Sequence, residues 1–277
     1  MRPHPDEALP VAALPTGEQV VGLLPAGGQG TRIGPLPCSK ELFPIGFRSH
    51  EEGQDLRPKV VSHYLLEKMR LAGIQEVYIV LRPGKWDIPT YFGDGSALGM
   101  HLAYLILGVP FGVPFTLDQA YPFVRNATVA FGFPDMLFDP EDCFVKLLRR
   151  QSASRADITL GLVPANTPPL KEDRVDFDND GNVRKLVLNN SESTLRYSWV
   201  VAVWRPTFTQ FLHNYVRDKI VDAQNVEFSA GHAIQSAIEA GLKVDSFVLG
   251  ETPYLDIGTP DGLLRALERS SREQRHV

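Results

Sequence analysis

One stretch near the N-terminus, Val20–Gly46, constrains the fold more than any other part of the chain. It starts with an apolar run, Val20–Leu24, which has the length of a buried strand, and continues into Ala26-Gly27-Gly28-Gln29-Gly30-Thr31-Arg32. Because glycine has no side chain to cover the backbone, such a turn presents a row of main-chain N–H groups that suits an anion. Arg32 and Lys40 add two cations. A surface turn with incidental basic residues is the alternative, but the combination favours a phosphate site.

The elements after this loop predict a βαβ unit. Residues Val61–Ala72 have apolar side chains at helical spacing, with Pro58 as a possible opening residue, and Glu76–Leu81 is the next buried strand. The polar residues Phe47–Arg57 between loop and helix predict an exposed excursion. A βαβ unit implies parallel strands, and parallel sheets bind ligands at the carboxyl ends of their strands. The glycine loop lies at such an end.

The rest of the chain continues the alternation of strands and helices and predicts an α/β fold. Strands are expected at Ala127–Phe133, Asp157–Val163, Tyr197–Trp204 and Val244–Val248, and a hairpin at Arg174–Val183. Helices are expected at Cys143–Arg150, Phe208–Ile220, Phe228–Ala240 and Asp261–Arg272. A helix and a strand fall within Trp86–Leu107, and a short helix begins near Thr116.

Length, charge and cysteine content limit the classes of function. A chain of 277 residues with 43% hydrophobic content is long enough for one domain, expected at residues 20–277 after an extended or poorly ordered segment, residues 1–19. The net charge is −5 without a long basic stripe, which favours nucleotides over polynucleotides as ligands. The two cysteines show no CxxC spacing, and no stretch reaches 18 apolar residues. We therefore expect a cytoplasmic protein that binds neither nucleic acid nor membrane.

Three motifs give the chain a family resemblance. Leu24–Gly46, LPAGGQGTRIGPLPCSKELFPIG, resembles the signature of the sugar-phosphate nucleotidyltransferases, in particular the glucose-1-phosphate thymidylyl- and uridylyltransferases. Phe133-Pro134-Asp135 resembles the family's strand-end aspartate motif, and Tyr254–Pro260, YLDIGTP, resembles its W/Y-x-D-x-G-T segment. The resemblance implies a Rossmann-like α/β fold of the nucleotide-diphospho-sugar transferase type. Its sheet is mixed and mostly parallel, with helices on both faces.

The resemblance also implies a reaction and a set of site residues. Such enzymes join a sugar 1-phosphate, here expected to be a hexose 1-phosphate, to the α-phosphate of a nucleoside triphosphate and release pyrophosphate. The loop from Ala26 to Thr31 would cradle the triphosphate, Arg32 would neutralise the pyrophosphate, and Lys40 would lie near the α-phosphate. Asp135 and Asp256 would hold Mg²⁺ between the phosphates. Relatives often form dimers or tetramers, so a homo-oligomer is expected.

The resemblance is weaker for the base. The segment Thr116-Leu117-Asp118-Gln119-Ala120 resembles the family's Gly-Leu-Ala-Gln-Ala, which lies against the nucleobase, so Leu117 is a candidate to pack on a pyrimidine. The alternative, which the sequence favours equally, is that Leu117 is an ordinary helix residue. The family's base-reading glutamine has no counterpart, because Phe111 aligns near its place. dTTP and UTP are the favoured substrates, and the choice between these bases, or of another base, stays open.

The sugar side, residues 157–260, departs further from the family. The family's Glu-Glu-Lys-Pro run, whose lysine binds the sugar phosphate, is replaced by Val187-Leu188-Asn189-Asn190. Lys185 or Arg184 is the candidate substitute, although adjacent strand residues face opposite sides and only one can point into the crevice. Two hypotheses follow. The chain is an active nucleotidyltransferase, or it is a non-catalytic relative that binds a nucleotide or nucleotide sugar as a regulatory or partner subunit.

Overall fold

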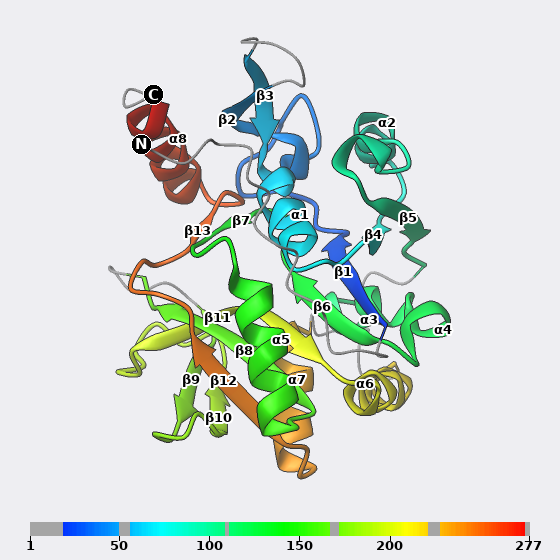
Figure 1. The fold of residues 1–277 in the computed structure, drawn as a ribbon, viewed down its shortest axis with the longest axis vertical. Coiled ribbons are helices and arrows are strands. Elements are labelled where there is room, and N and C mark those ends of the chain that lie inside the picture. Colours follow the sequence, from blue (N-terminus) through cyan, green and yellow to red (C-terminus); the bar gives the residue numbers. More distant parts are fainter. Residues whose placement is uncertain (1–18, 50–55, 109–110, 167–171, 221–227, 275–277) are drawn as a thin grey trace, which may run out of the picture.

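A computed structural model describes residues 19–49, 56–108, 111–166, 172–220 and 228–274 of the chain. Its centre is a nine-stranded sheet (Figure 1) in which β1 (Val20–Ala26) lies between β4 (Glu76–Leu81) and β6 (Thr128–Gly132). Both neighbours run parallel to β1, and β5 (His101–Ile106) continues the sheet parallel to β4. The predicted βαβ unit is confirmed. The predicted segment at residues 1–19 lies outside the described residues, apart from Gln19.

Beyond β6 the sheet becomes mixed. β11 (Tyr197–Trp204) pairs antiparallel with β6 on one side and with β8 (Ile158–Pro164) on the other, and β12 (Val244–Val248) runs parallel to β8. The predicted hairpin forms from β9 (Arg174–Phe177) and β10 (Val183–Val187), and it joins the sheet where Ser198 pairs with Arg174. The sheet is therefore mixed, with a parallel block around β1, as predicted.

Hydrophobic cores cover both faces of this sheet. Alternate residues of β1 point to opposite sides: Val21 and Leu23 join one core, and Val20 and Leu24 join the other. The first core also contains residues of α3 (Val113–Asp118), α4 (Tyr121–Val124), α6 (Pro206–Lys219) and α7 (Ala230–Glu239). The second contains residues of α1 (Val61–Leu71), α2 (Asp87–Phe92) and α5 (Cys143–Ser154). Helices on both faces are the arrangement expected of this fold class.

Glycines let α1 approach the sheet closely. A Cβ atom at Gly22 in β1 would lie 2.8 Å from Met69 Sδ, and one at Gly132 in β6 would lie 2.7 Å from Leu65 Cδ1. Any larger residue at either position would collide with the helix. The close packing fixes α1 over the strands whose carboxyl ends carry the candidate site.

A third, smaller core joins the C-terminal helix to the rest. α8 (Pro260–Gln274) contributes Ala266, and the two-residue strands β7 (Met136–Leu137) and β13 (Leu255–Asp256) contribute Leu137 and Leu255. β7 and β13 pair antiparallel. This short pairing brings a late segment of the chain against the end of β6.

Phe47, Leu56 and Arg57 are exposed, as predicted for the segment 47–57. Both ends of this segment also belong to a two-stranded ribbon of β2 (Pro44–Ser49) and β3 (Leu56–Val60), which was not predicted. Pro58 does not open α1; it lies in β3 opposite Phe47, and α1 begins at Val61. Proline is tolerated in such a ribbon because an edge strand leaves some N–H groups without a sheet partner.

Candidate active site

The glycine loop follows the carboxyl end of β1 and lines a cleft of about 370 Å³. Gly27 and Gly28 are close to other parts of this cleft: a Cβ at Gly27 would lie 3.2 Å from Leu107 Cδ2, and one at Gly28 would lie 3.6 Å from Lys40 Nζ. Gly30 has a φ of +66°, a backbone conformation that favours glycine. The glycines therefore let Lys40 and the base of the cleft come close to the backbone.

Two carboxylates from distant parts of the sequence meet in the same cleft. Asp135 comes three residues after β6, and Asp256 is the second residue of β13. Pairing of Asp256 with Met136, and a hydrogen bond of 3.1 Å from the Ile257 N–H to the Asp135 carbonyl, hold the two segments together. Both side chains line the cleft. The two predicted metal ligands are therefore brought into one site.

Each carboxylate contacts one of the two predicted cations. Lys40 Nζ binds Asp135 Oδ2, with both side chains largely buried. Arg32 donates a hydrogen bond of 3.1 Å to Asp256 Oδ2, and its side chain remains 62% exposed. The Gly258 N–H donates to Asp256 Oδ1 at 2.8 Å, which fixes the carboxylate from the other side. The four polar residues thus form two neighbouring ion pairs.

The electrostatics of the cleft balance two carboxylates against two cations. Burial and the nearby charge of Asp135 raise the pKa of Asp256, although Arg32 and Lys40 act against this shift. Burial also disfavours the charged form of Lys40, but Asp135, Glu41 and Asp256 outweigh it and raise the pKa of the lysine. Two carboxylates this close need positive charge, which Lys40 and Arg32 supply in this structure.

The two carboxylates suit Mg²⁺ but provide only part of its set of ligands. Carboxylate oxygens are the hard ligands that this ion prefers, and it usually keeps several waters and binds substrate phosphate as well. In the part of the chain that the structure describes, no group of three or more His, Cys, Asp or Glu side chains is placed to hold a metal ion. A magnesium site here therefore needs water and substrate oxygens beside Asp135 and Asp256.

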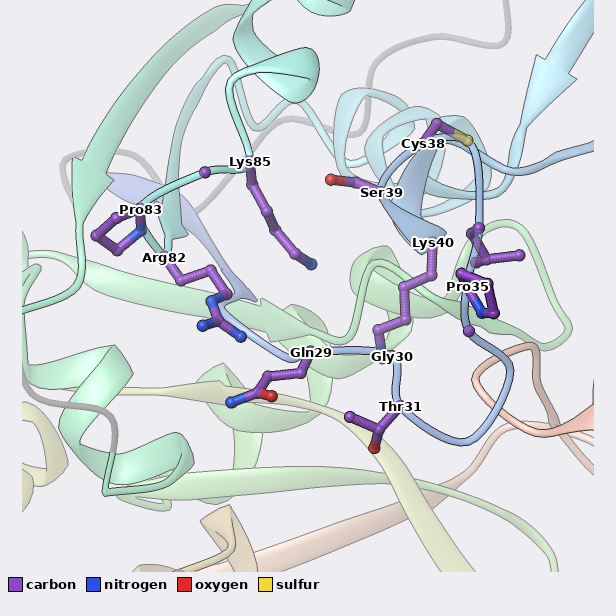
Figure 2. A pocket seen from close by; sticks show the side chains of 13 residues that line it. Gln29, Gly30, Thr31, Pro35, Cys38, Ser39, Lys40, Arg82, Pro83 and Lys85 are labelled. Carbon is purple, nitrogen blue, oxygen red and sulfur yellow. The ribbon is translucent and has the colours of Figure 1, made fainter.

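A second cavity of about 540 Å³, which we name the basic cavity, adjoins the cleft and shares Gln29, Lys40 and Arg82 with it. Figure 2 shows that its walls come from the glycine loop with the segment up to Lys40, and from the turn Arg82–Lys85 after β4. Arg82 and Lys85 were missed by the sequence-based prediction. The position of the turn at a strand end beside β1 was the available signal.

Lys85 forms an ion pair with Glu41, the residue next to Lys40. Its Nζ donates to both Glu41 oxygens at 2.7 Å, and the two side chains are buried. Burial raises the pKa of Glu41 although Lys85 lowers it. Glu41 and Lys40 lie together in a single turn of 3₁₀ helix, η1 (Lys40–Leu42). The Glu41–Lys85 pair thereby anchors the backbone that carries Lys40.

Leu117 does not line the cleft. It is buried in the core beside α6 and α7, whereas Val113 and Thr116 of the same helix line the cleft. This placement is that of an ordinary core residue, and it does not support contact between Leu117 and a nucleobase. The helical period explains the outcome, because adjacent residues of α3 face different directions.

The candidates for the sugar phosphate also lie apart from the cleft. Lys185 and Arg184 are exposed on β10, and neither residue lines the cleft or the basic cavity. The polar groups near this hairpin are instead buried: Glu172 and Arg174 form an ion pair of 3.0 Å, each side chain only 4% exposed. Asp173 accepts hydrogen bonds from the Asn189 N–H and from Trp199 Nε1. The structure does not support Lys185 as a ligand of these cavities.

Within the described residues, none of the helices is both long enough and apolar enough to cross a membrane.

Comparison with known proteins gives relatives at moderate identity. No protein-family model matches the chain. The chain is 26% identical over 250 residues to the low-salt glycan biosynthesis nucleotidyltransferase Agl11 of Haloferax volcanii; the match covers 88% of the chain and 64% of the relative. It is 28% identical over 254 residues to a glucose-1-phosphate thymidylyltransferase of Mycolicibacterium smegmatis, covering 88% and 80%. The chain therefore spans less than two thirds of the Haloferax relative.

Solved structures share the fold. A Bacillus anthracis protein described as a glucose-1-phosphate thymidylyltransferase superposes with a TM-score of 0.75 at 17% identity, covering 91% of this chain and 95% of that one. A UDP-glucose pyrophosphorylase in complex with UDP-glucose gives 0.70 at 14% identity, covering 92% and 99%. The fold class implied by the sequence motifs is confirmed. In sequence the chain is thus similar to nucleotidyltransferases that act on sugar phosphates, and it shares the fold of such enzymes.

Proposed function

We propose that this protein transfers a nucleotidyl group from a nucleoside triphosphate to a sugar 1-phosphate and releases pyrophosphate. One observation carries the proposal: Lys40, Arg32, Asp135 and Asp256 come together in one cleft at the end of β1 and β6. The relatives named above support the same reaction class. In this proposal residues 20–277 act as one domain, with the sugar-binding part at 157–260.

The reaction needs charge neutralisation more than a side-chain nucleophile. A phosphate oxygen of the sugar 1-phosphate forms a bond to the α-phosphorus, and the bond from that phosphorus to the β-phosphate oxygen breaks. The electron pair leaves with pyrophosphate, so no proton transfer is required. Lys40 lies where it can stabilise charge that develops at the α-phosphate, and N–H groups of the loop Ala26–Thr31 can hold the other phosphates.

Asp135 and Asp256 are the residues that would hold Mg²⁺, and the metal would supply positive charge to the bound phosphates. Lys40 and Arg32 now neutralise these carboxylates. With Mg²⁺ held by Asp135 and Asp256, the Lys40 ammonium and the Arg32 guanidinium would be available to phosphate oxygens.

For the base we propose a pyrimidine triphosphate, dTTP or UTP, with Val113 and Thr116 of α3 as the contacting side chains in place of Leu117. Both residues line the cleft together with Leu107. A hexose 1-phosphate is the proposed acceptor. We also propose a cytoplasmic location, which the two free cysteines support, and a homo-oligomer.

The test is pyrophosphate release in the presence of Mg²⁺, measured over a panel of nucleoside triphosphates and sugar 1-phosphates. We expect turnover with at least one pair, and its loss in Asp135→Asn. The matched control is Asp218→Asn, which changes an exposed aspartate on α6 and should leave the rate unchanged. Equal rates for Asp135→Asn and the unmodified protein would exclude the assigned role of Asp135.

A second candidate function is supported by the sugar side. The family's phosphate-binding lysine is absent, and Lys185 lines neither the cleft nor the basic cavity. This favours a binding subunit that holds a nucleotide or nucleotide sugar without turnover. Measurable nucleotide binding, combined with no pyrophosphate from any substrate pair, would select this candidate over the enzyme.

A further inference from the structure

The basic cavity has an unusual balance of charge. Its lining includes three cations, Lys40, Arg82 and Lys85, and no Asp or Glu among the described residues. Backbone of the glycine loop, at Gln29, Gly30 and Thr31, forms another part of the wall. Its volume of about 540 Å³ lies within the range usual for ligand sites. Such a cavity suits a multivalent anion.

The three cations differ in whether a carboxylate already neutralises their charge. Lys40 is paired with Asp135, and Lys85 is held by both oxygens of Glu41. The Arg82 guanidinium has no hydrogen bond or ion pair to any residue that the structure describes, and the side chain is partly exposed. Arg82 is therefore the cation of this cavity whose charge is free to meet a ligand.

Arg82 also occupies the boundary between the two spaces. It follows β4 directly, next to β1, and it lines both the cleft and the basic cavity. Arg32 lies elsewhere: it lines the cleft, where it contacts Asp256, but it does not line the basic cavity. A phosphate chain that passes from the cleft into the basic cavity would therefore meet Arg82.

We propose that the basic cavity binds the β- and γ-phosphates of the nucleoside triphosphate, and then the pyrophosphate product, with Arg82 as their principal side-chain ligand. The proposal rests on the proposed function and deepens it, because it places the leaving group on the side of β4. In this proposal Arg82 is the main cation for pyrophosphate, whereas the family resemblance implies Arg32 for that role. Arg guanidinium groups bind phosphate oxygens in a bidentate manner, which suits this role.

The direct test is binding of inorganic pyrophosphate to the full chain, measured by calorimetry with and without Mg²⁺. In Arg82→Gln we expect the dissociation constant to rise about ten- to a hundredfold, because a charge-assisted contact is lost. The matched control, Arg125→Gln, changes an exposed arginine after α4 that lines neither cavity and should bind as the unmodified protein does. A change of less than twofold in Arg82→Gln, or no binding to the unmodified protein, would overturn the proposal.

Cys38 provides a local reporter, because it lines the basic cavity while Cys143 is buried in a core. Pyrophosphate should slow the reaction of Cys38 with a maleimide several-fold in the unmodified protein but not in Arg82→Gln at the same concentration. Labelling at each cysteine is separated by peptide mass spectrometry. Bound pyrophosphate that leaves the Cys38 rate unchanged would place the anion outside this cavity and contradict the proposal.

These measurements are independent of turnover. If Arg82→Gln loses pyrophosphate binding while no substrate pair releases pyrophosphate, the result supports the anion site and contradicts the proposed enzymatic activity. If turnover is found and Arg82→Gln keeps the Michaelis constant for pyrophosphate in the reverse reaction, the enzyme stands and the role of Arg82 fails.

Discussion

The loop after β1 and the hairpin β9–β10 use charge in different ways. Around the loop, Lys40 and Arg32 line open space together with their carboxylate partners, and Arg82 lines it without a carboxylate partner among the described residues. Near the hairpin, the ion pair of Glu172 and Arg174 is buried, while Lys185 is exposed on the strand. We name these two regions the loop side and the hairpin side. The loop side has the features of a binding site, whereas the hairpin side stabilises structure.

The difference between the two sides bears on the proposed reaction. Chemistry that depends on the triphosphate needs only the loop side, because the glycines, cations and carboxylates lie there. A sugar phosphate needs a cation from elsewhere, and the hairpin side offers none to the two cavities among the described residues. In the proposed reaction, Arg32 is the candidate cation for the acceptor phosphate, because it lines the cleft and its side chain is 62% exposed.

The largest expected effect is on turnover in Lys40→Ala. Removing a group that stabilises the transition state should lower the rate of pyrophosphate release about a thousandfold. Lys185→Ala should stay within twofold, since Lys185 lines neither cavity. A comparable loss in both variants would mean that the hairpin side takes part in the reaction, and the distinction between the two sides would fail.

Arg174→Ala tests the hairpin side through stability. Removing one partner of a buried ion pair leaves Glu172 charged and unpaired, so we expect the free energy of unfolding to fall by about 3 kcal/mol. Arg196→Ala breaks the exposed pair with Glu251, whose side chains are 68% and 75% exposed, and should cost less than about 1 kcal/mol. Urea denaturation measures both. Equal losses would show that the Glu172–Arg174 pair contributes no more to stability than the exposed pair does.

Helix α1 contains a buried group whose pKa makes stability depend on pH, His63. Burial, together with the charges of Arg48 and Lys59, lowers its pKa from 6.5 to about 4. Between these values the unfolded chain binds a proton that the folded protein does not, so stability falls as pH falls from 6.5 towards 4. The loss should reach about 3 kcal/mol. Burial raises the pKa of Asp173 on the hairpin side, which gives the opposite slope above the ordinary aspartate pKa.

Urea denaturation from pH 4 to pH 7.5 tests this assignment. His63→Asn should flatten the part of the curve between pH 6.5 and 4, and His101→Asn, which changes an exposed histidine, should not. If both variants keep the slope of the unmodified protein, His63 is not its source.

The smallest expected effect is that of one methyl group in the cleft. A Cβ at Gly258 would lie 2.9 Å from Asp256 Oδ1 and 3.3 Å from Lys40 Nζ and from an Arg32 nitrogen. Gly258→Ala should therefore shift the polar groups and lower turnover about tenfold, because small misplacements of reacting groups are costly. Thermal stability should hardly change. Gly250→Ala, where nothing lies within 4 Å of the added carbon, is the control. Equal rates for both variants would show that the cleft tolerates the shift.

Much of the fold could be predicted from local pattern. The buried strands at β1, β4, β6 and β11 and the helices α1, α5 and α6 follow from apolar runs and helical spacing. The β2–β3 ribbon was missed because charged residues and prolines, among them Pro58, interrupt its apolar residues, which does not match the pattern of a strand. Leu117 was assigned by its motif alone, and only the direction of α3 shows that it belongs to the core.

By itself the sequence determined the chemistry of the loop side: three glycines, two cations and two strand-end aspartates, each recognisable because glycine and strand ends have local signatures. Tertiary structure decided which of these groups meet. The β7–β13 pairing brings Asp256 to Asp135, and the packing of β4 beside β1 brings Arg82 and Lys85 to the glycine loop. Such neighbours depend on long-range strand pairing and helix packing, which no local stretch of sequence specifies.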